Sequence, residues 1–194
     1  MSSQTKVLAD SGAVVGKRVI LRPPAERDLQ EFIGLNRCSA RFHSGLVSPP
    51  VDTQQFLEYL ERGRRPDSAS FLMCSTESGA ILGAISLSQI FRAGFQSAYL
   101  GYFVGAPFAG QGYMTEAIQL MLRYAFKQLR LHRLEANIQP GNIASIALVR
   151  RAGFVREGYS RRYLKICGQW RDHERWAIIA EDWKPRNLKS RSTK

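Results

Sequence analysis

A glycine-rich junction between a strand and a helix is the part of the sequence best suited to hold a charged ligand. An apolar run ends at Val104, and in the loop that follows Ala109, Gly110 and Gly112 are small enough for the backbone to approach a ligand closely. The helix expected after Tyr113 offers unpaired amide groups and the positive end of its dipole. Together these features predict a binding site for a pyrophosphate.

Two common phosphate-binding motifs do not account for this junction. The strands before it read as an antiparallel meander and the G-x-G-x-x-G spacing is absent, which disfavours a Rossmann site. No Gly-Lys-Ser or Gly-Lys-Thr occurs, which disfavours a Walker loop. For the glycines taken alone, a tight turn that binds no ligand remains an alternative.

The stretch from Tyr99 to Ala117 resembles the cofactor loop of GNAT acetyltransferases, whose pattern runs Gln/Arg-x-x-Gly-x-Gly/Ala. Gly112 matches the central glycine, whereas Ala109 stands at the Gln/Arg position and Met114 at the last small position. The Met-Thr-Glu-Ala that follows is typical of the branch that acetylates the N-termini of ribosomal proteins.

Two later segments resemble the same branch. Asn142 and Ser145 match its Asn-x-x-Ser helix, which ends in Gly153-Phe154. The stretch from Gly168 to His173 resembles the late hairpin of the RimJ type, the alanine N-acetyltransferase of a small-subunit ribosomal protein. With Arg22-Pro23 near the start, the resemblance covers about residues 18–179 in family order. The chain is thus identified as a member of the GNAT family, in its RimJ/RimL-like branch and closest to the RimJ type.

The resemblance implies an α/β domain with the GNAT fold. A mixed, mostly antiparallel sheet flanked by helices would splay between its fourth and fifth strands, the strand ending at Val104 and the strand at 134–139. Acetyl-CoA, as the substrate, would place its pantetheine arm in the split, held by backbone groups of Phe103 and Val104, and its pyrophosphate on the amides of the loop from Gly110 to Thr115. The residues expected to bind it are Phe103, Val104, Ala109, Gly110, Gln111, Gly112, Tyr113, Met114, Thr115, Asn142 and Ser145.

Acetyl transfer needs a neutral amine, a polarised thioester carbonyl and a proton for the leaving thiolate. A backbone N–H of the splayed strand could stabilise the oxyanion. By its matching position in the family, Ser145 is the candidate proton donor, and Asn142 beside it can cap the helix and face the ligand with one side chain. Tyr159 and Tyr163 are weaker candidates, since each also reads as a half-buried strand aromatic.

The general base is the least defined part of the site. Related enzymes often place a carboxylate at the position of Asn137 or near Arg162, and neither position is acidic here. Glu135 shares a strand face with Asn137 by alternation and is the candidate base, with a solvated strand residue as the alternative. His173 is a further candidate, with a structural histidine as the alternative.

A site without a strong base suits an acceptor that is already partly neutral. A free α-amino group has a pKa of about 7.8, so roughly a seventh is neutral at pH 7, against less than about one part in a thousand for a lysine side chain. The chemistry therefore favours a protein N-terminus, with a ribosomal protein as the acceptor. A GNAT acting on an amino acid, polyamine or aminoglycoside, and a non-catalytic ribosome-assembly or RNA-binding factor, remain alternatives.

The elements that must position these residues follow from the hydrophobic periodicity. Asp28 is expected to cap an early helix, Asp52 or Thr53 to begin a second, and residues 37–51 between them read as a loop. The later elements are strands at about 18–22, 70–75, 80–87, 97–104 and 132–139, helices at 114–129 and from Asn142 to Ala152, and a hairpin of 159–167 and 170–179.

The composition is that of an ordinary soluble protein, with 44% hydrophobic residues and no apolar run of the roughly 20 residues that span a bilayer. No secretory signal is visible in the first fifteen residues. Cys38, Cys74 and Cys167 are widely spaced and form no CxxC pair, which argues against a zinc site and a disulfide framework. We expect a cytoplasmic protein without a metal.

The charge balance points to an anionic partner. Twenty-eight Lys and Arg against 16 acidic residues give a net charge of +12, and residues 184–194 hold five of these cations and no acid. We expect a lead-in at 1–15, one domain at 16–183 and a basic tail at 184–194. The basic surface and tail could contact ribosomal RNA; a solvated tail with no partner is the alternative.

Overall fold

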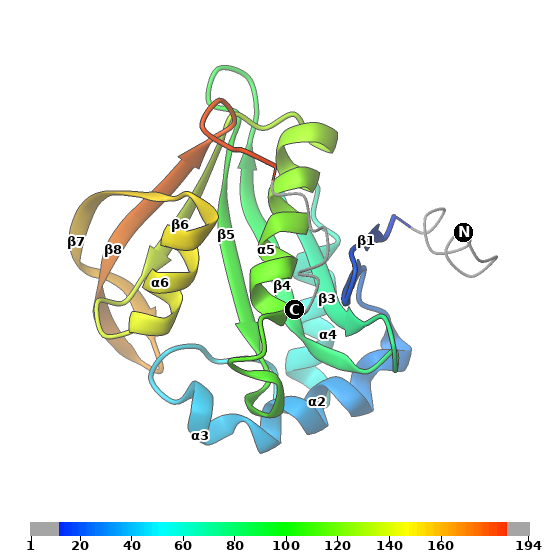
Figure 1. The fold of residues 1–194 in the computed structure, drawn as a ribbon. Coiled ribbons are helices and arrows are strands. Elements are labelled where there is room, and N and C mark those ends of the chain that lie inside the picture. The colour runs from blue at the N-terminus through cyan, green and yellow to red at the C-terminus, as the bar shows by residue number, and fades with distance from the viewer. Residues whose placement is uncertain (1–11, 186–194) are drawn as a thin grey trace, which may run out of the picture.

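One eight-stranded sheet organises the structure, a computed structural model that describes residues 12–185 (Figure 1). Its strand order is β1-β2-β3-β4-β5-β6-β8-β7, with every neighbouring pair antiparallel except the parallel pair β5 and β6. The strands are β1 Val14–Val15, β2 Val19–Arg22, β3 Ala69–Ser75, β4 Ile81–Phe91, β5 Ser97–Val104, β6 Arg133–Ile138, β7 Val155–Ile166 and β8 Gln169–Ile179.

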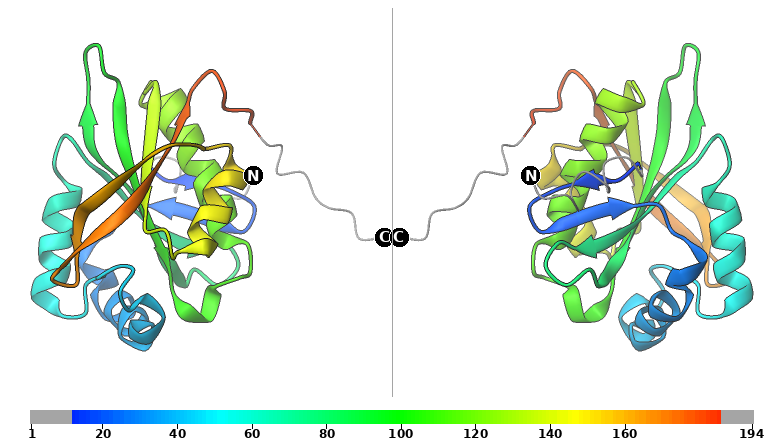
Figure 2. Two further views of the ribbon diagram at one scale, coloured as in Figure 1. Left: turned by 90° about the vertical axis from the view of Figure 1, so that its left-hand side faces the viewer. Right: turned by 90° about the vertical axis from the view of Figure 1, so that its right-hand side faces the viewer.

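Helices cover both faces of the sheet, as the two side views in Figure 2 show. The helical elements are η1 Glu26–Asp28, α2 Leu29–Cys38, α3 Ala40–His43, α4 Thr53–Gly63, η2 Ala106–Phe108, α5 Tyr113–Arg123, η3 Tyr124–Gln128 and α6 Ile143–Ala152. One core joins α5 and α6 to the sheet, with Ile118 and Met121 fully buried. On the opposite face Phe32 of α2 and Phe56 of α4 form a second core. The sheet is thus the middle of three layers.

The sheet opens between β5 and β6. The two strands pair only from Ser97 with Arg133 to Tyr99 with Glu135. Beyond that point β5 stays paired with β4 up to Val104, while β6 stays paired with β8. The predicted fold and the position of its split are therefore confirmed. The diverging strands are the fifth and sixth here because β1 lies within the expected lead-in, where Val14 pairs with Leu21 and is buried.

Two expectations near the N-terminal helices were wrong. The Asp28 side chain makes no capping bond to α2, because it accepts two hydrogen bonds from Arg22, at 2.8 and 2.7 Å, and one from the Ala25 amide. Burial works to raise the pKa of Asp28, but the bonds from Arg22 and Ala25 outweigh it and lower that pKa. The presumed loop at 37–51 contains the short helix α3. This helix brings the His43 ring within hydrogen-bond distance of the Val104 carbonyl of β5.

The predicted starts and ends of the other helices are largely confirmed. Asp52 caps α4 by accepting from the Gln55 amide, and Asn142 caps α6 by accepting from the Ser145 amide. Gly153 ends α6 with a φ of 101°. The helix expected at 114–129 consists of α5 and a π-helical turn, η3, which follows it directly.

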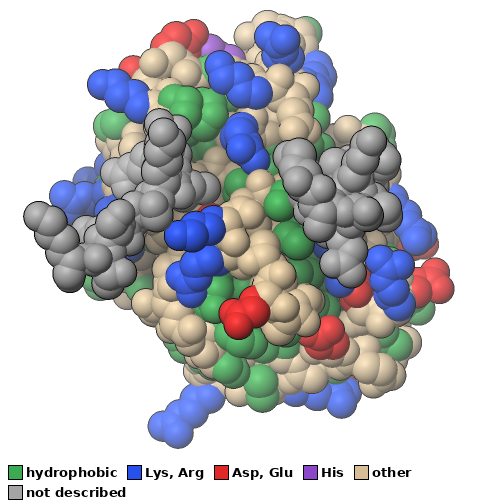
Figure 3. Space-filling model, turned by 45° about the vertical axis from the view of Figure 1, so that its right-hand side comes forward, with side chains coloured by type: hydrophobic (Ala, Val, Ile, Leu, Met, Phe, Trp, Pro, Cys, Tyr) green, Lys and Arg blue, Asp and Glu red, His purple; other side chains and the backbone are tan. Residues whose placement is uncertain are grey.

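No helix among the described residues is both long and apolar enough to cross a bilayer. Lys and Arg side chains are spread over the face of the molecule shown in Figure 3. Most of the expected basic tail, residues 186–194, lies outside the described part of the chain, as do residues 1–11 of the expected lead-in.

Candidate active site

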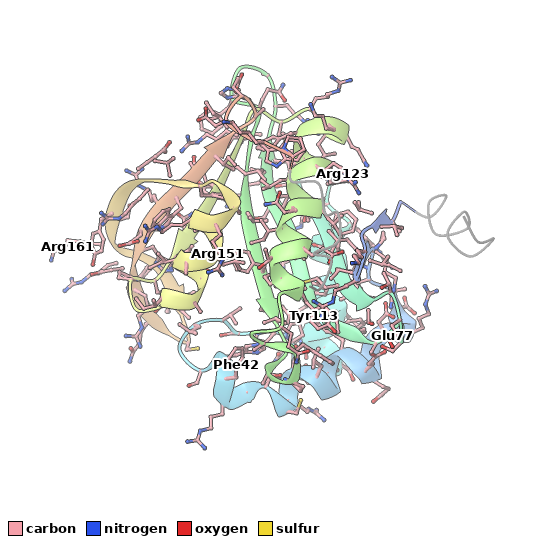
Figure 4. All side chains as sticks on the ribbon, in the orientation of Figure 1. Phe42, Glu77, Tyr113, Arg123, Arg151 and Arg161 are labelled. Carbon is pink, nitrogen blue, oxygen red and sulfur yellow. The ribbon has the colours of Figure 1, made fainter. Side chains whose placement is uncertain are left out.

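A cavity of about 540 Å³ occupies the split between β5 and β6. It is bounded by these two strands, the start of α5, one side of α6, the segment from α3 to Val47, and the β7–β8 hairpin. Tyr113 on α5, Arg151 on α6 and Phe42 on α3 lie around it (Figure 4). Residues far apart in the sequence thus meet at the position where the strands separate.

The glycine loop gives one end of the cavity the geometry of a phosphate site. Gly110 and Gly112 have φ values of 74° and 83°, which favour glycine, and no backbone or side chain fills the space beside Gly110. Gly112 directly precedes α5, so the amides of Tyr113, Met114 and Thr115 are in the first turn and have no partner within the helix. Those three residues line the cavity, as do Ala109 and both glycines.

Gln111 is the one predicted loop residue that does not line the cavity. Its side chain donates to the Pro107 carbonyl at 2.8 Å, and its own carbonyl accepts from Arg18 at 2.9 Å. Gln111 therefore shapes the loop and holds Arg18 beside it.

Two arginines, one beside the loop and one in the cavity wall, were not predicted. The Arg18 guanidinium lies 4.1 Å from the centre of the Tyr113 ring, next to the loop, and Arg151 lines the cavity from α6. Arg18 adds positive charge beside the loop where an anion would bind, and Arg151 adds it to the wall of the cavity. No local pattern could reveal Arg18, since it reaches the loop from the turn before β2, across 93 residues of sequence.

The charge requirement of this loop can be tested at Gly112. We expect Gly112→Asp to weaken acetyl-CoA binding at least about tenfold more than Gly112→Asn, because the two side chains have the same shape and only aspartate repels the pyrophosphate. Asn and Asp both tolerate a positive φ better than other residues, so the fold should survive in both variants. Calorimetric titration with acetyl-CoA measures the difference, and equal affinities would contradict the assignment.

The backbone of β5 presents only alternate residues to the split. Gly105 donates to the Leu82 carbonyl of β4, so by alternation Phe103 also bonds towards β4, while Tyr102 and Val104 point to the open edge. The Val104 carbonyl accepts from His43 Nε2 at 3.0 Å. The expectation that Phe103 and Val104 both offer backbone groups is thus corrected: Val104 and Tyr102 supply them. The Phe103 side chain still lines the cavity.

Ser145 and Tyr102 face each other across the split. Their hydroxyl oxygens are 2.5 Å apart, which joins α6 to β5 inside the cavity. Asn142 and Ser145 both line the cavity, so these two predicted residues are brought together there. Burial raises the pKa of Tyr102 to about 12, although the hydrogen bond with Ser145 lowers it in part. The Tyr102 phenol therefore stays protonated throughout the neutral range.

Glu135 does not reach the cavity. It lies where β5 and β6 are still paired, opposite Tyr99, and its carboxylate accepts from Arg133 at 2.9 Å. The alternation that related Glu135 to Asn137 was sound, but only Asn137 lies beyond the point where the strands separate and lines the cavity. The structure therefore gives Glu135 an ion pair in the closed part of the sheet.

The late hairpin supplies one of its three candidate residues to the cavity. The Tyr159 hydroxyl donates to Asp172 at 2.5 Å on the exposed side of the hairpin. Tyr163 packs against His173, with 6.1 Å between the ring centres, and neither tyrosine lines the cavity. His173 does line it and is 3% exposed.

Fold and site together define an acyltransferase that uses a CoA thioester, and residues 18–155 match the family described as acetyltransferase (GNAT) domain. The chain belongs to the GNAT acetyltransferase family. It is 34% identical over 175 residues to the probable N-acetyltransferase YjcK of Bacillus subtilis, which covers 86% of this chain and 97% of that protein.

Two further relatives are more specific. The [ribosomal protein uS5]-alanine N-acetyltransferase of Escherichia coli is 42% identical over 105 residues, 54% of either chain, so the likeness spans about half of that protein. The structure of Mycobacterium smegmatis RimJ in complex with CoA-disulfide superposes with a TM-score of 0.75 at 27% identity, covering 84% of this chain and 82% of that one. An acetyl-CoA substrate agrees with this neighbour.

Proposed function

We propose that this enzyme acetylates the α-amino group of a protein N-terminus, with an alanine-terminated ribosomal protein as the acceptor. One observation carries the proposal: among the described residues that line the cavity, none is Asp or Glu. Phe42, Leu46 and Val47 border the side opposite the phosphate site, together with Leu164 and Ile166 of the hairpin. A polyamine or aminoglycoside has several cations and would require carboxylates there, whereas a peptide N-terminus has one.

The similarity to the uS5-alanine acetyltransferase supports the choice of a ribosomal N-terminus. Alanine at the first position suits the surroundings, because a small apolar side chain would meet Leu46 and Val47 on one wall and Leu164 on the other. The α-amino group also needs little help to lose its proton near neutral pH, unlike the amine of lysine.

The proposal assigns the chemistry to four residues that line the cavity. The Val104 amide, on the open edge of β5, would donate to the thioester oxygen as negative charge develops there. Ser145 would give its hydroxyl proton to the leaving thiolate, and Tyr102, at 2.5 Å, would pass its own proton to Ser145. Asn142 would hold the first turn of α6, and with it Ser145, in place.

A ribosomal particle is the second partner that we propose, in the cytoplasm. The hairpin stretch 161–171 carries four cations and no acid, and Trp170 within it is 61% exposed. Arg161 projects away from the body of the protein (Figure 4). Cations next to an exposed aromatic ring suit RNA, through phosphate contacts and stacking on bases. Such a surface repels a free basic ribosomal protein but draws the enzyme to one assembled on RNA.

The proposal is tested by measuring CoA release and product mass with a panel of acceptors. We expect turnover with alanine-terminated ribosomal peptides and none with the same peptides blocked at the N-terminus. Turnover only with polyamines, amino acids or aminoglycosides would move the enzyme to the small-amine class. Acetyl-CoA binding without turnover, even on intact ribosomal subunits, would favour an assembly factor. Cosedimentation with subunits, weakening as salt rises, checks the RNA contact.

A further inference from the structure

His173 places a buried imidazole at the side of the cavity away from the phosphate site. It lies on β8 near the hairpin residues Leu164 and Ile166, all three of which line the cavity. Its Nδ1 is 3.0 Å from the Arg171 carbonyl oxygen. A carbonyl only accepts, so Nδ1 carries the hydrogen and, in the neutral ring, Nε2 keeps a free lone pair. The protein thus fixes the tautomer in which Nε2 can accept a proton.

The strand also fixes the direction in which His173 points. Trp176 and Ile178 of β8 face the core beneath α5 and α6. By strand alternation, His173 faces the opposite side of the sheet, where the segment from α3 to Val47 closes the cavity. A peptide N-terminus entering between this segment and the hairpin would pass the imidazole before it reached Val104.

The other titratable groups of the cavity are already occupied or unsuited. His43 uses Nε2 to donate to Val104, and its Nδ1 is buried without a partner. Tyr102 is bonded to Ser145, and its raised pKa keeps it protonated, so it cannot serve as the base. Arg151 has a guanidinium group, which only donates hydrogen bonds, and Tyr113 lies beside the Arg18 guanidinium at the phosphate site. With no carboxylate among the described lining residues, His173 is the group left to act as base.

We propose that His173 is the general base of the reaction, an inference that rests on the proposed acylation of an N-terminus. Nε2 takes one proton from the α-ammonium group, and the freed nitrogen lone pair forms a bond to the thioester carbon. The carbon–sulfur bond breaks and its electron pair leaves on sulfur, which is protonated by Ser145. The tetrahedral nitrogen loses its remaining extra proton to solvent, Ser145 regains a proton from solvent through Tyr102, and His173 later releases its own proton to solvent. Amide, CoA thiol and one released proton account for all atoms and charges.

The proposal is tested with His173→Asn and two acceptors that differ in their need for a base. The asparagine amide nitrogen sits close to the position of Nδ1, so it keeps the bond to Arg171 and removes Nε2. We expect kcat/KM to fall about 100-fold for an alanine-terminated peptide. For the same peptide carrying an aminooxyacetyl terminus, which is already neutral at pH 7, it should fall less than about fivefold. Acetyl-CoA affinity should stay within about threefold.

Matched variants separate a base from a structural histidine. His132→Asn removes an exposed histidine that is paired with Glu181 outside the cavity, and it should leave both rates unchanged. His173→Gln, a second variant in case His173→Asn fails to bind acetyl-CoA, should show the same selective loss. Near-wild-type rates with either His173 variant, or equal losses on both acceptors, would overturn the assignment. A wild-type enzyme inactive on every N-terminal peptide would instead overturn the proposed function and the base with it.

Discussion

Replacing Ser145 by alanine should lower kcat about 100- to 1000-fold while acetyl-CoA affinity changes less than about threefold. The serine hydroxyl lies inside the cavity on the first turn of α6, bonded to the Tyr102 hydroxyl at 2.5 Å. A positioned proton donor contributes about 100- to 10,000-fold to a rate. Single-turnover measurements with saturating acetyl-CoA and an alanine-terminated peptide separate the chemical step from binding.

Varying the thiol of the acetyl thioester distinguishes a Ser145 that donates a proton from a Ser145 that only packs against the substrate. With an acetyl thioester of a more acidic thiol, the departing thiolate needs its proton less, so the loss caused by Ser145→Ala should shrink at least about tenfold. Tyr102→Phe keeps the serine but removes the donor behind it, and should show the same dependence with a smaller loss. A loss that stays constant across thioesters would mean that Ser145 only shapes the cavity.

The raised pKa of Tyr102 bears on this relay and on stability. Because Tyr102 titrates near 12 in the folded protein and near 10 in an unfolded chain, it remains a donor at any pH at which the enzyme works. The same difference means that the unfolded chain binds fewer protons between pH 10 and 12. The stability contributed by this group is therefore complete below pH 10 and is lost as the pH rises towards 12.

The parts of the site that the sequence predicts are those set by local geometry. Gly110 and Gly112 are needed for positive φ values in one short loop, and Asn142 and Gly153 mark the ends of one helix. Each of these features depends on residues within a few positions of one another. The split in the sheet was expected from the family resemblance, and β5 and β6 show it.

The parts that the sequence does not predict depend on contacts between distant elements. Whether Glu135 or Asn137 enters the cavity depends on where β6 leaves β5, which no alternation pattern specifies. His43 reaches Val104 across 61 residues, from a helix too short to show a periodic pattern. The sequence offered Glu135 first and His173 second as the base, and only the fold shows that the histidine lines the cavity and the carboxylate does not.

Glu116 shows how such a distant contact supports the site. It lies in the first turn of α5, in the Met-Thr-Glu-Ala stretch, and is 8% exposed. Its Oε1 accepts from the backbone amides of Lys17, Arg18 and Val19, at 2.5, 2.9 and 3.3 Å. One carboxylate therefore holds the turn between β1 and β2 against the phosphate site. Gly16 in that turn must be a glycine, because an added Cβ would collide with this oxygen.

Glu116→Ala should lower the free energy of unfolding by about 3 kcal/mol, because it leaves the buried Val19 amide and the partly buried amides of Lys17 and Arg18 without their shared acceptor. For a chain of this size that corresponds to a fall in Tm of about 10 °C. Glu116→Gln keeps one acceptor oxygen and should lose less than half as much stability. Glu77→Ala, at the exposed turn labelled in Figure 4, should change the Tm by less than about 2 °C.

Since Arg18 is held in the same turn as Lys17 and Val19, acetyl-CoA affinity should fall with Glu116→Ala and not with Glu77→Ala. A Tm for Glu116→Ala equal to that of Glu77→Ala would show that the turn is held by other contacts.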